Sequence, residues 1–150
     1  MLYFAPLVMK KFLFLFILPL LAIVTQAADV PEESELTSMV DSSITSFGKS
    51  IKKKDFSGFY KEIAHLWQKQ TTPEQLETAF KDFLDKDIDL PAAIKDKDPV
   101  FNQKATIDSD GVLLVKGYYP TTPNRILFEL KYVEEDEEWK LVGIHVNLKE

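Results

Sequence analysis

The 150-residue sequence contains no cysteine, which excludes disulfide bonds, thiolate metal sites, a cysteine nucleophile and the lipid-bearing cysteine of a lipoprotein. Stability must therefore come from packing alone. Histidine is scarce as well, with only His65 and His145 present. A glycine-rich phosphate loop, a metal-binding pattern of histidine and glutamate, and the nucleophile elbow of hydrolases are all missing. We therefore expect no catalytic residue, no metal site and no cofactor.

The first 27 residues contain the three parts of a secretory signal. Two lysines precede an uncharged apolar run from Phe12 to Val24, and a small-residue exit ends at Ala27. The run is shorter than the roughly 20 residues that cross a bilayer as a helix, and Pro19 would kink it. Cleavage after Ala27 is therefore favoured over an uncleaved anchor. The pattern is that of a bacterial Sec-type signal peptide, so we expect residues 28–150 to form one exported domain, periplasmic or secreted.

The predicted mature chain is strongly acidic. The whole sequence has a net charge of −6, and the segment to be removed carries two lysines and no acidic residue, which leaves −8 for residues 28–150. We expect no nucleic acid and no anionic membrane surface as a partner, because both are negatively charged. Contact with a membrane is expected only if the N-terminal segment is uncleaved. The start codon, Met1 or Met9, stays open because the lysines directly follow Met9.

Helical periodicity dominates the first half of the predicted domain. Apolar residues at steps of three and four over residues 36–51 mark one stripe of a long first helix. A second helix is expected after residue 55, and a third begins with the capping pattern Thr72-Pro73-Glu74-Gln75. The second stripe comprises Phe59, Tyr60, Ile63, Leu66 and Trp67, and the third Leu76, Phe80, Phe83 and Leu84. We expect residues 85–99, with two prolines, to cross without helix to a strand half.

The remaining residues alternate between apolar and polar, which is typical of antiparallel strands. A first hairpin turns at Ser109-Asp110-Gly111, with glycine in the left-handed position, and a second turns at a loop centred on Asp136. The acidic run around Asp136 lacks the glycine of a calcium loop, so we expect a solvated hairpin tip. Matching the apolar faces sets the register. The predicted pairs are Ile107 with Leu113, Ala105 with Val115, Leu130 with Val142, and Phe128 with Ile144.

The second hairpin has a half-apolar outer face in this register. Leu127, Trp139 and Leu141 point away from the core, beside His145. Such a face needs cover, either from the curled end of the sheet or a loop, or from a second copy or another partner. We expect a homodimer through these four residues. His65 is expected on the surface of the second helix, so neither histidine is a suitable base.

Two short motifs accompany this order of elements: Lys54-Asp55-Phe56-Ser57-Gly58-Phe59-Tyr60 at the entry to the second helix, and Trp139-Lys-Leu-Val-Gly-Ile144 in the last strand. With them, the chain resembles the nuclear transport factor 2-like superfamily over residues 34–149, and more closely its small exported bacterial members of unknown function. The resemblance implies an α+β fold in which N-terminal helices pack on a curved antiparallel sheet of about four strands. This cystatin-like or nuclear transport factor 2-like cone has a pocket at its open end.

Members of that superfamily include ketosteroid-isomerase-like and polyketide-cyclase-like enzymes, pseudoenzymes and a periplasmic domain of a secretion system, so the fold does not select a function. The leading hypothesis is an exported non-enzymatic domain that binds a small apolar ligand or a protein partner. Tyr119, expected to face inward near the pocket, belongs either to the core or rim or to a ligand site. Tyr60 and Trp67 are the other candidate ligand-binding residues.

Two alternatives remain open. One is an enzyme of the isomerase or cyclase type that uses a pocket carboxylate with a tyrosine such as Tyr119. The other is a membrane-tethered component of the envelope or of a secretion system, held by an uncleaved N-terminus.

Overall fold

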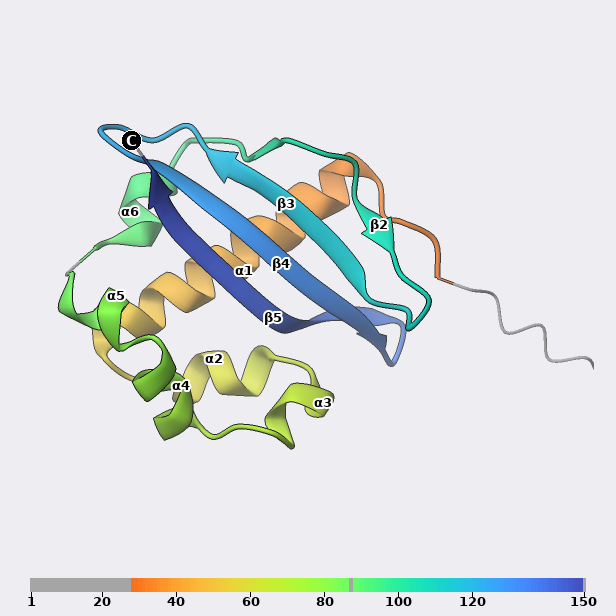
Figure 1. Ribbon diagram of the computed structural model, residues 1–150, viewed down its shortest axis with the longest axis horizontal. Coiled ribbons are helices and arrows are strands. Elements are labelled where there is room, and N and C mark those ends of the chain that lie inside the picture. The colour runs from red at the N-terminus through yellow and green to blue at the C-terminus, as the bar shows by residue number, and fades with distance from the viewer. Residues whose placement is uncertain (1–27, 87, 150) are drawn as a thin grey trace, which may run out of the picture.

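The computed structural model describes residues 28–86 and 88–149, and over this part the chain has an α+β fold (Figure 1). The predicted signal, residues 1–27, lies outside the described residues. In the described part, no helix has the length and apolar composition needed to cross a membrane. The helices are α1 (Glu33–Lys53), α2 (Ser57–Glu62), α3 (His65–Gln68), α4 (Pro73–Ala79), α5 (Lys81–Asp85) and α6 (Leu90–Ile94). The strands are β1 (Val100–Phe101), β2 (Thr106–Ile107), β3 (Leu113–Tyr119), β4 (Arg125–Glu135) and β5 (Glu138–Lys149).

The long first helix predicted from the apolar stripe is confirmed as α1, which runs diagonally across one face of the sheet (Figure 1). Val40, Ile44 and Phe47, one or two turns apart, are fully buried there. The helix ends where Lys54 adopts the left-handed conformation with φ 54° and donates its N–H to the Ile51 carbonyl. The buried face of α1 packs against the sheet and forms part of the hydrophobic core.

The predicted second helix is wrong in its length, because it is divided into α2 and α3. Ile63 takes an extended conformation, and Ala64 donates its N–H to the Leu141 carbonyl of β5 at 2.9 Å. The chain therefore leaves the helix to bond the edge of the sheet. A backbone partner far away in the sequence decides the break, which helical periodicity alone does not reveal.

The capping pattern at the start of the third predicted helix is confirmed. Thr72 Oγ1 accepts the Gln75 N–H, and Gln75 Oε1 accepts the Thr72 N–H in return. The helix was nevertheless predicted too long, since it breaks at Phe80 into α4 and α5. The expected non-helical crossing is also wrong in part: it contains α6, where Asp89 Oδ1 accepts the Ala92 N–H.

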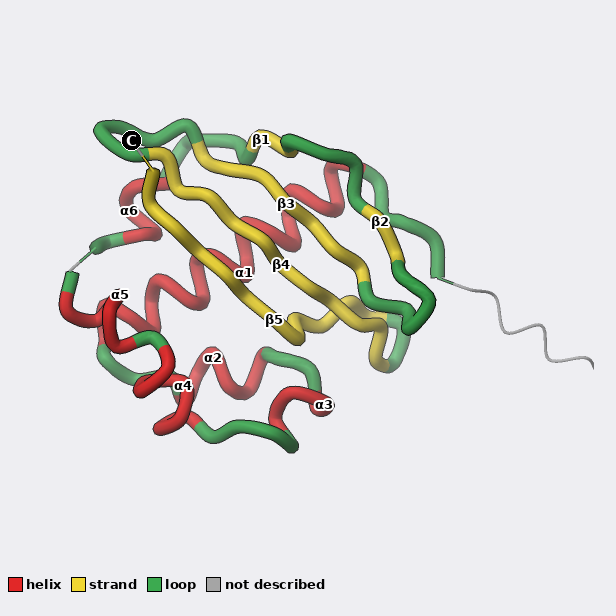
Figure 2. The backbone as a smooth tube through the Cα atoms, viewed as in Figure 1, coloured by secondary structure: helices red, strands yellow, loops and turns green. Residues whose placement is uncertain are grey.

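The sheet is antiparallel and has five strands, with the order β1-β3-β4-β5 and with β2 also paired to β3 (Figure 2). The first hairpin has the predicted turn, in which Gly111 has φ 77°, and Ile107 pairs with Leu113 as expected. The Ala105–Val115 pair lies beyond this ladder, which covers Thr106 and Ile107. The chain before the turn forms two strands of two residues each, so the sheet has one strand more than expected.

The register predicted for the second hairpin is wrong by two residues. A two-residue turn, Asp136-Glu137, has positive φ at both positions and brings Glu135 opposite Glu138. A β-bulge follows, because Tyr132 pairs with Leu141 while Lys131 pairs with Gly143. Beyond the bulge, the pairs are Leu130 with Ile144 and Phe128 with Val146. The extra residue, Val142, reverses the alternation of side chains along β5.

The single hydrophobic core has an aromatic extension on the side of α1 where α2, α4 and α5 lie, and Figure 2 shows the position of these helices. Phe47 joins it to the main core, with ring centroids 4.8 Å from Phe80 and 5.8 Å from Phe59 in edge-on geometry. Its five phenylalanines are Phe47, Phe56, Phe59, Phe80 and Phe83. These contacts fix α2 beside α1 and so shape the cleft described next.

Candidate functional site

A cleft of about 320 Å³ lies between α1, α2 and the bulged end of the β4–β5 hairpin. One part of its wall is apolar and one part is lined by serine hydroxyl groups. Two glutamate carboxylates and one lysine also line the cleft. The lining residues are Glu35, Ser38, Met39, Ser42, Ser43, Ser46, Phe59, Glu62, Ile63, Tyr132, Trp139, Lys140 and Leu141.

The serine wall comes from α1. Ser38, Ser42 and Ser46 recur every fourth residue, so they lie on one side of the helix, separate from the apolar stripe that enters the core. The Ser46 hydroxyl donates to Glu62 Oε2 of α2. This hydrogen bond spans the cleft between the two helices.

Tyr132 of β4 is the most buried polar group of the cleft. Its hydroxyl donates to the Met39 carbonyl at 3.3 Å and lies 2.9 Å from Ser43 Oγ. Burial raises the pKa of Tyr132 above its ordinary value. The hydroxyl therefore stays neutral and ties β4 to α1, while the ring contributes to the apolar wall.

Trp139 and Leu141 occupy this same wall, so their predicted place on the outer face is wrong. The bulge at Val142 turns both side chains toward α1. Leu141 is buried, whereas Trp139 is half-buried and opens into the cleft. The other two candidate interface residues do lie on the outer face: Leu127 is half-buried and His145 is exposed. The four residues thus belong to two different surfaces.

Tyr119 faces inward as predicted, but it does not line the cleft. Its side chain is buried, and its hydroxyl donates to Asp41 Oδ1 on α1 at 2.5 Å. Burial, with a further contribution from the Asp41 hydrogen bond and charge, raises the pKa of Tyr119 above its ordinary value. Of the two readings of this residue, the structure therefore favours the core tyrosine.

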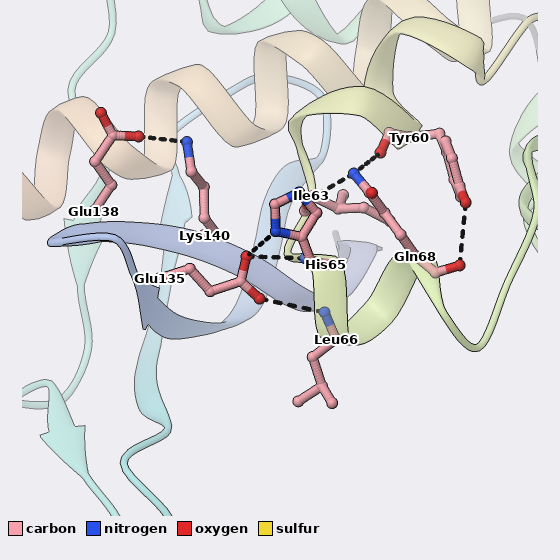
Figure 3. Close-up of polar contacts among 8 residues, drawn as sticks. All are labelled: Tyr60, Ile63, His65, Leu66, Gln68, Glu135, Glu138 and Lys140. Carbon is pink, nitrogen blue, oxygen red and sulfur yellow. Dashed lines mark hydrogen bonds and ion pairs between the residues drawn. The ribbon is translucent and has the colours of Figure 1, made fainter.

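Tyr60 and Trp67 also lie outside the cleft lining. The Tyr60 hydroxyl donates to the Gln68 carbonyl at 3.1 Å, and Gln68 Nε2 donates to the Tyr60 carbonyl at 2.8 Å (Figure 3). Trp67 packs edge-on against Phe59, with ring centroids 6.1 Å apart. Both residues thus stabilise the connection between α2 and α3.

Glu135, beside the hairpin turn, holds this connection against the sheet (Figure 3). Its carboxylate accepts the His65 N–H at 2.9 Å and the Leu66 N–H at 3.2 Å, with His65 Nδ1 3.3 Å away. These donors, the His65 N–H foremost, lower the pKa of Glu135 from its ordinary 4.5. Ile63, which lines the cleft, is thereby fixed beside the hairpin. His65 itself lies exposed on the helix surface, as predicted.

Comparison of the sequence with protein-family models and with curated proteins, and of the fold with solved structures, gave no match.

Proposed function

We propose that residues 28–150 form a non-enzymatic binding domain that takes a small apolar ligand in the cleft between α1, α2 and the β4–β5 hairpin. The observation that carries this proposal is the half-buried Trp139, which opens into a cleft of about 320 Å³. Ligand sites in proteins are typically concave, mainly apolar, and about 300–1,000 Å³ in volume. The serine hydroxyls supply the few polar groups that orient a ligand in such sites.

The proposal includes the cone of the nuclear transport factor 2-like superfamily as the architecture. Its support is the position of α1 across one face of an antiparallel sheet, with the short helices beside it (Figure 1). The cleft then corresponds to the open end of the cone. Fold alone does not imply a ligand, so the binding proposal depends on the side chains of the cleft.

The alternative of an isomerase or cyclase has one specific observation in its favour: a tyrosine and a carboxylate, Tyr119 and Asp41, are hydrogen bonded. The Tyr119 hydroxyl donates this hydrogen bond to Asp41 Oδ1, and the Tyr119 side chain is buried. A substrate could react with either group only after the hydrogen bond between Tyr119 and Asp41 had been broken. We therefore prefer binding to catalysis.

Export, tethering and dimerisation complete the proposal. We propose that residues 1–27 are removed on export, and mass spectrometry of the protein from its host tests this. A mature N-terminus at Ala28 supports it, whereas an intact N-terminus favours the tethered envelope component.

We also propose a homodimer through the outer face around Leu127. Sedimentation of the wild type and of Leu127→Glu tests this, and a monomeric wild type at high concentration refutes it.

The binding proposal is tested with the neutral apolar dye N-phenyl-1-naphthylamine. Ser42 lines the cleft from the exposed side of α1, so Ser42→Phe fills the cleft without disturbing the core. Ser34→Phe is the matched control, since Ser34 is exposed on the same helix outside the cleft. We expect dye fluorescence to rise on binding to the wild type and to Ser34→Phe, and to be lost with Ser42→Phe. A wild type that does not bind the dye, or two variants that bind it equally, refutes the proposal.

A further inference from the structure

The charged side chains that line the cleft differ in whether an oppositely charged side chain neutralises them. Two carboxylates, Glu35 and Glu62, and one ammonium group, Lys140, line it. Lys140 Nζ lies 2.5 Å from Glu138 Oε2, so its charge is already paired (Figure 3). Within residues 28–86 and 88–149, no ion pair joins Glu35 or Glu62 to a basic side chain. Two carboxylates and one ammonium group leave the lining of the cleft with a net charge of −1.

Glu62 is the less compensated of the two carboxylates. Glu35 lies in the first turn of α1, where the partial positive charge of the helix N-terminus favours an acid. Glu62 is the last residue of α2, at the end where exposed carbonyls carry partial negative charge. Its polar contact is the Ser46 hydroxyl, which donates to Oε2. Lys49 borders the adjoining surface groove together with Glu62 but makes no ion pair with it.

The apolar wall beside these carboxylates also favours a cation. Trp139 and Tyr132 present aromatic rings to the cleft, and an ammonium group is attracted to the face of such rings. An alkyl chain gains free energy when it leaves water for this wall. An apolar carboxylate would bury the same chain but bring its negative charge toward Glu62.

We propose that the ligand of the cleft is an apolar amine: its protonated amino group binds Glu62, and its hydrocarbon body packs against Met39, Tyr132 and Trp139. This inference rests on the proposed binding function and specifies the class of ligand. The amine donates hydrogen bonds to the Glu62 carboxylate and to neighbouring serine hydroxyls. No covalent step is involved.

Three probes with the same eight-carbon chain separate the inference from the function on which it rests. n-Octylamine, n-octanol and octanoate are titrated into the ¹⁵N-labelled protein, and binding is followed at the indole N–H signals of its two tryptophans. Trp139 lines the cleft and Trp67 does not, so Trp67 serves as an internal control. We expect octylamine to bind about threefold to tenfold more tightly than octanol, and octanoate more weakly than both. The shifts should concentrate at Trp139.

Glu62→Gln tests the carboxylate, and Glu33→Gln, which removes an equal charge from exposed α1 outside the cleft, is its control. We expect Glu62→Gln to abolish the preference for octylamine and leave octanol binding unchanged. Equal binding of all three probes, or an amine preference that survives in Glu62→Gln, refutes the amine inference and leaves the binding function intact. A preference for octanoate refutes it as well. If no probe shifts Trp139, the binding function itself fails.

Discussion

Gly117 of β3 lies where two backbones approach too closely for a side chain. It pairs with Phe101 of β1 on one side and with Phe128 of β4 on the other. A Cβ added at this position would lie 2.3 Å from the Val100 carbonyl oxygen and 2.7 Å from Phe128 Cζ. The first contact is with backbone, which cannot rotate away. Gly117→Ala must therefore push β1 off the edge of the sheet.

The expected cost follows from these contacts. Overpacking a buried site costs about 1–3 kcal/mol of unfolding free energy. Separation of β1 adds the loss of ladder hydrogen bonds, each worth about 0.5–1.5 kcal/mol. We therefore expect Gly117→Ala to lower the free energy of unfolding by about 2–4 kcal/mol, a large part of the roughly 5–15 kcal/mol typical of a domain.

Gly143→Ala is the matched control, because Gly143 is a glycine of the same sheet with room for a methyl group. Its nearest contact would be Lys131 Cβ at 3.6 Å, an ordinary van der Waals distance. We expect its stability to stay within about 0.5 kcal/mol of the wild type. Urea unfolding followed by circular dichroism measures both variants. Equal stability of Gly117→Ala and Gly143→Ala would show that β1 does not press on β3 as described.

Two further predictions concern titration. The pKa of Tyr119 and of Tyr132 is raised above the ordinary 10.0, so their contribution to stability is complete below pH 10 and is lost as the pH rises beyond it. In urea unfolding, the free energy of unfolding should therefore fall steeply as the pH rises above 10, and Tyr119→Phe should reduce this fall. The same pH dependence in wild type and Tyr119→Phe would refute the prediction. The lowered pKa of Glu135 acts in the opposite direction: its contribution is present above pH 4.5 and is lost as the pH falls below it. Glu135→Gln should lower the free energy of unfolding by about 1 kcal/mol at neutral pH and by little in acid. Glu134→Gln, at an exposed neighbouring position, should leave the free energy of unfolding unchanged. Equal effects of the two substitutions would contradict the role of Glu135.

Local signals in the sequence predicted the elements that depend on local interactions. The apolar stripe of α1, the Thr72–Gln75 capping box and the Gly111 turn were all recognised from neighbouring residues. The breaks at Ile63 and Phe80 were missed. Ala64 donates to the Leu141 carbonyl, a partner that lies in another element and becomes available only in the folded chain. Periodicity carries no information about such a contact.

The sequence analysis missed the apolar wall of the candidate site because of one residue, Val142. Without the bulge at Val142, Trp139 and Leu141 fall on the outer face, and the apolar wall of the cleft disappears from the prediction. Gly143, an isolated glycine within a strand, is the signal that could have revealed the bulge. The recurrence of serine every fourth residue at Ser38, Ser42 and Ser46 could have identified the polar wall.

The position of α1 also determines when the protein can fold during synthesis. Asp41 and Ser43 bond Tyr119 and Tyr132, which lie 78 and 89 residues later in the chain. The part of α1 that faces the sheet therefore stays uncovered until β3 and β4 have been made. Contacts between residues so far apart in the sequence slow folding, because a long loop must close before they can form.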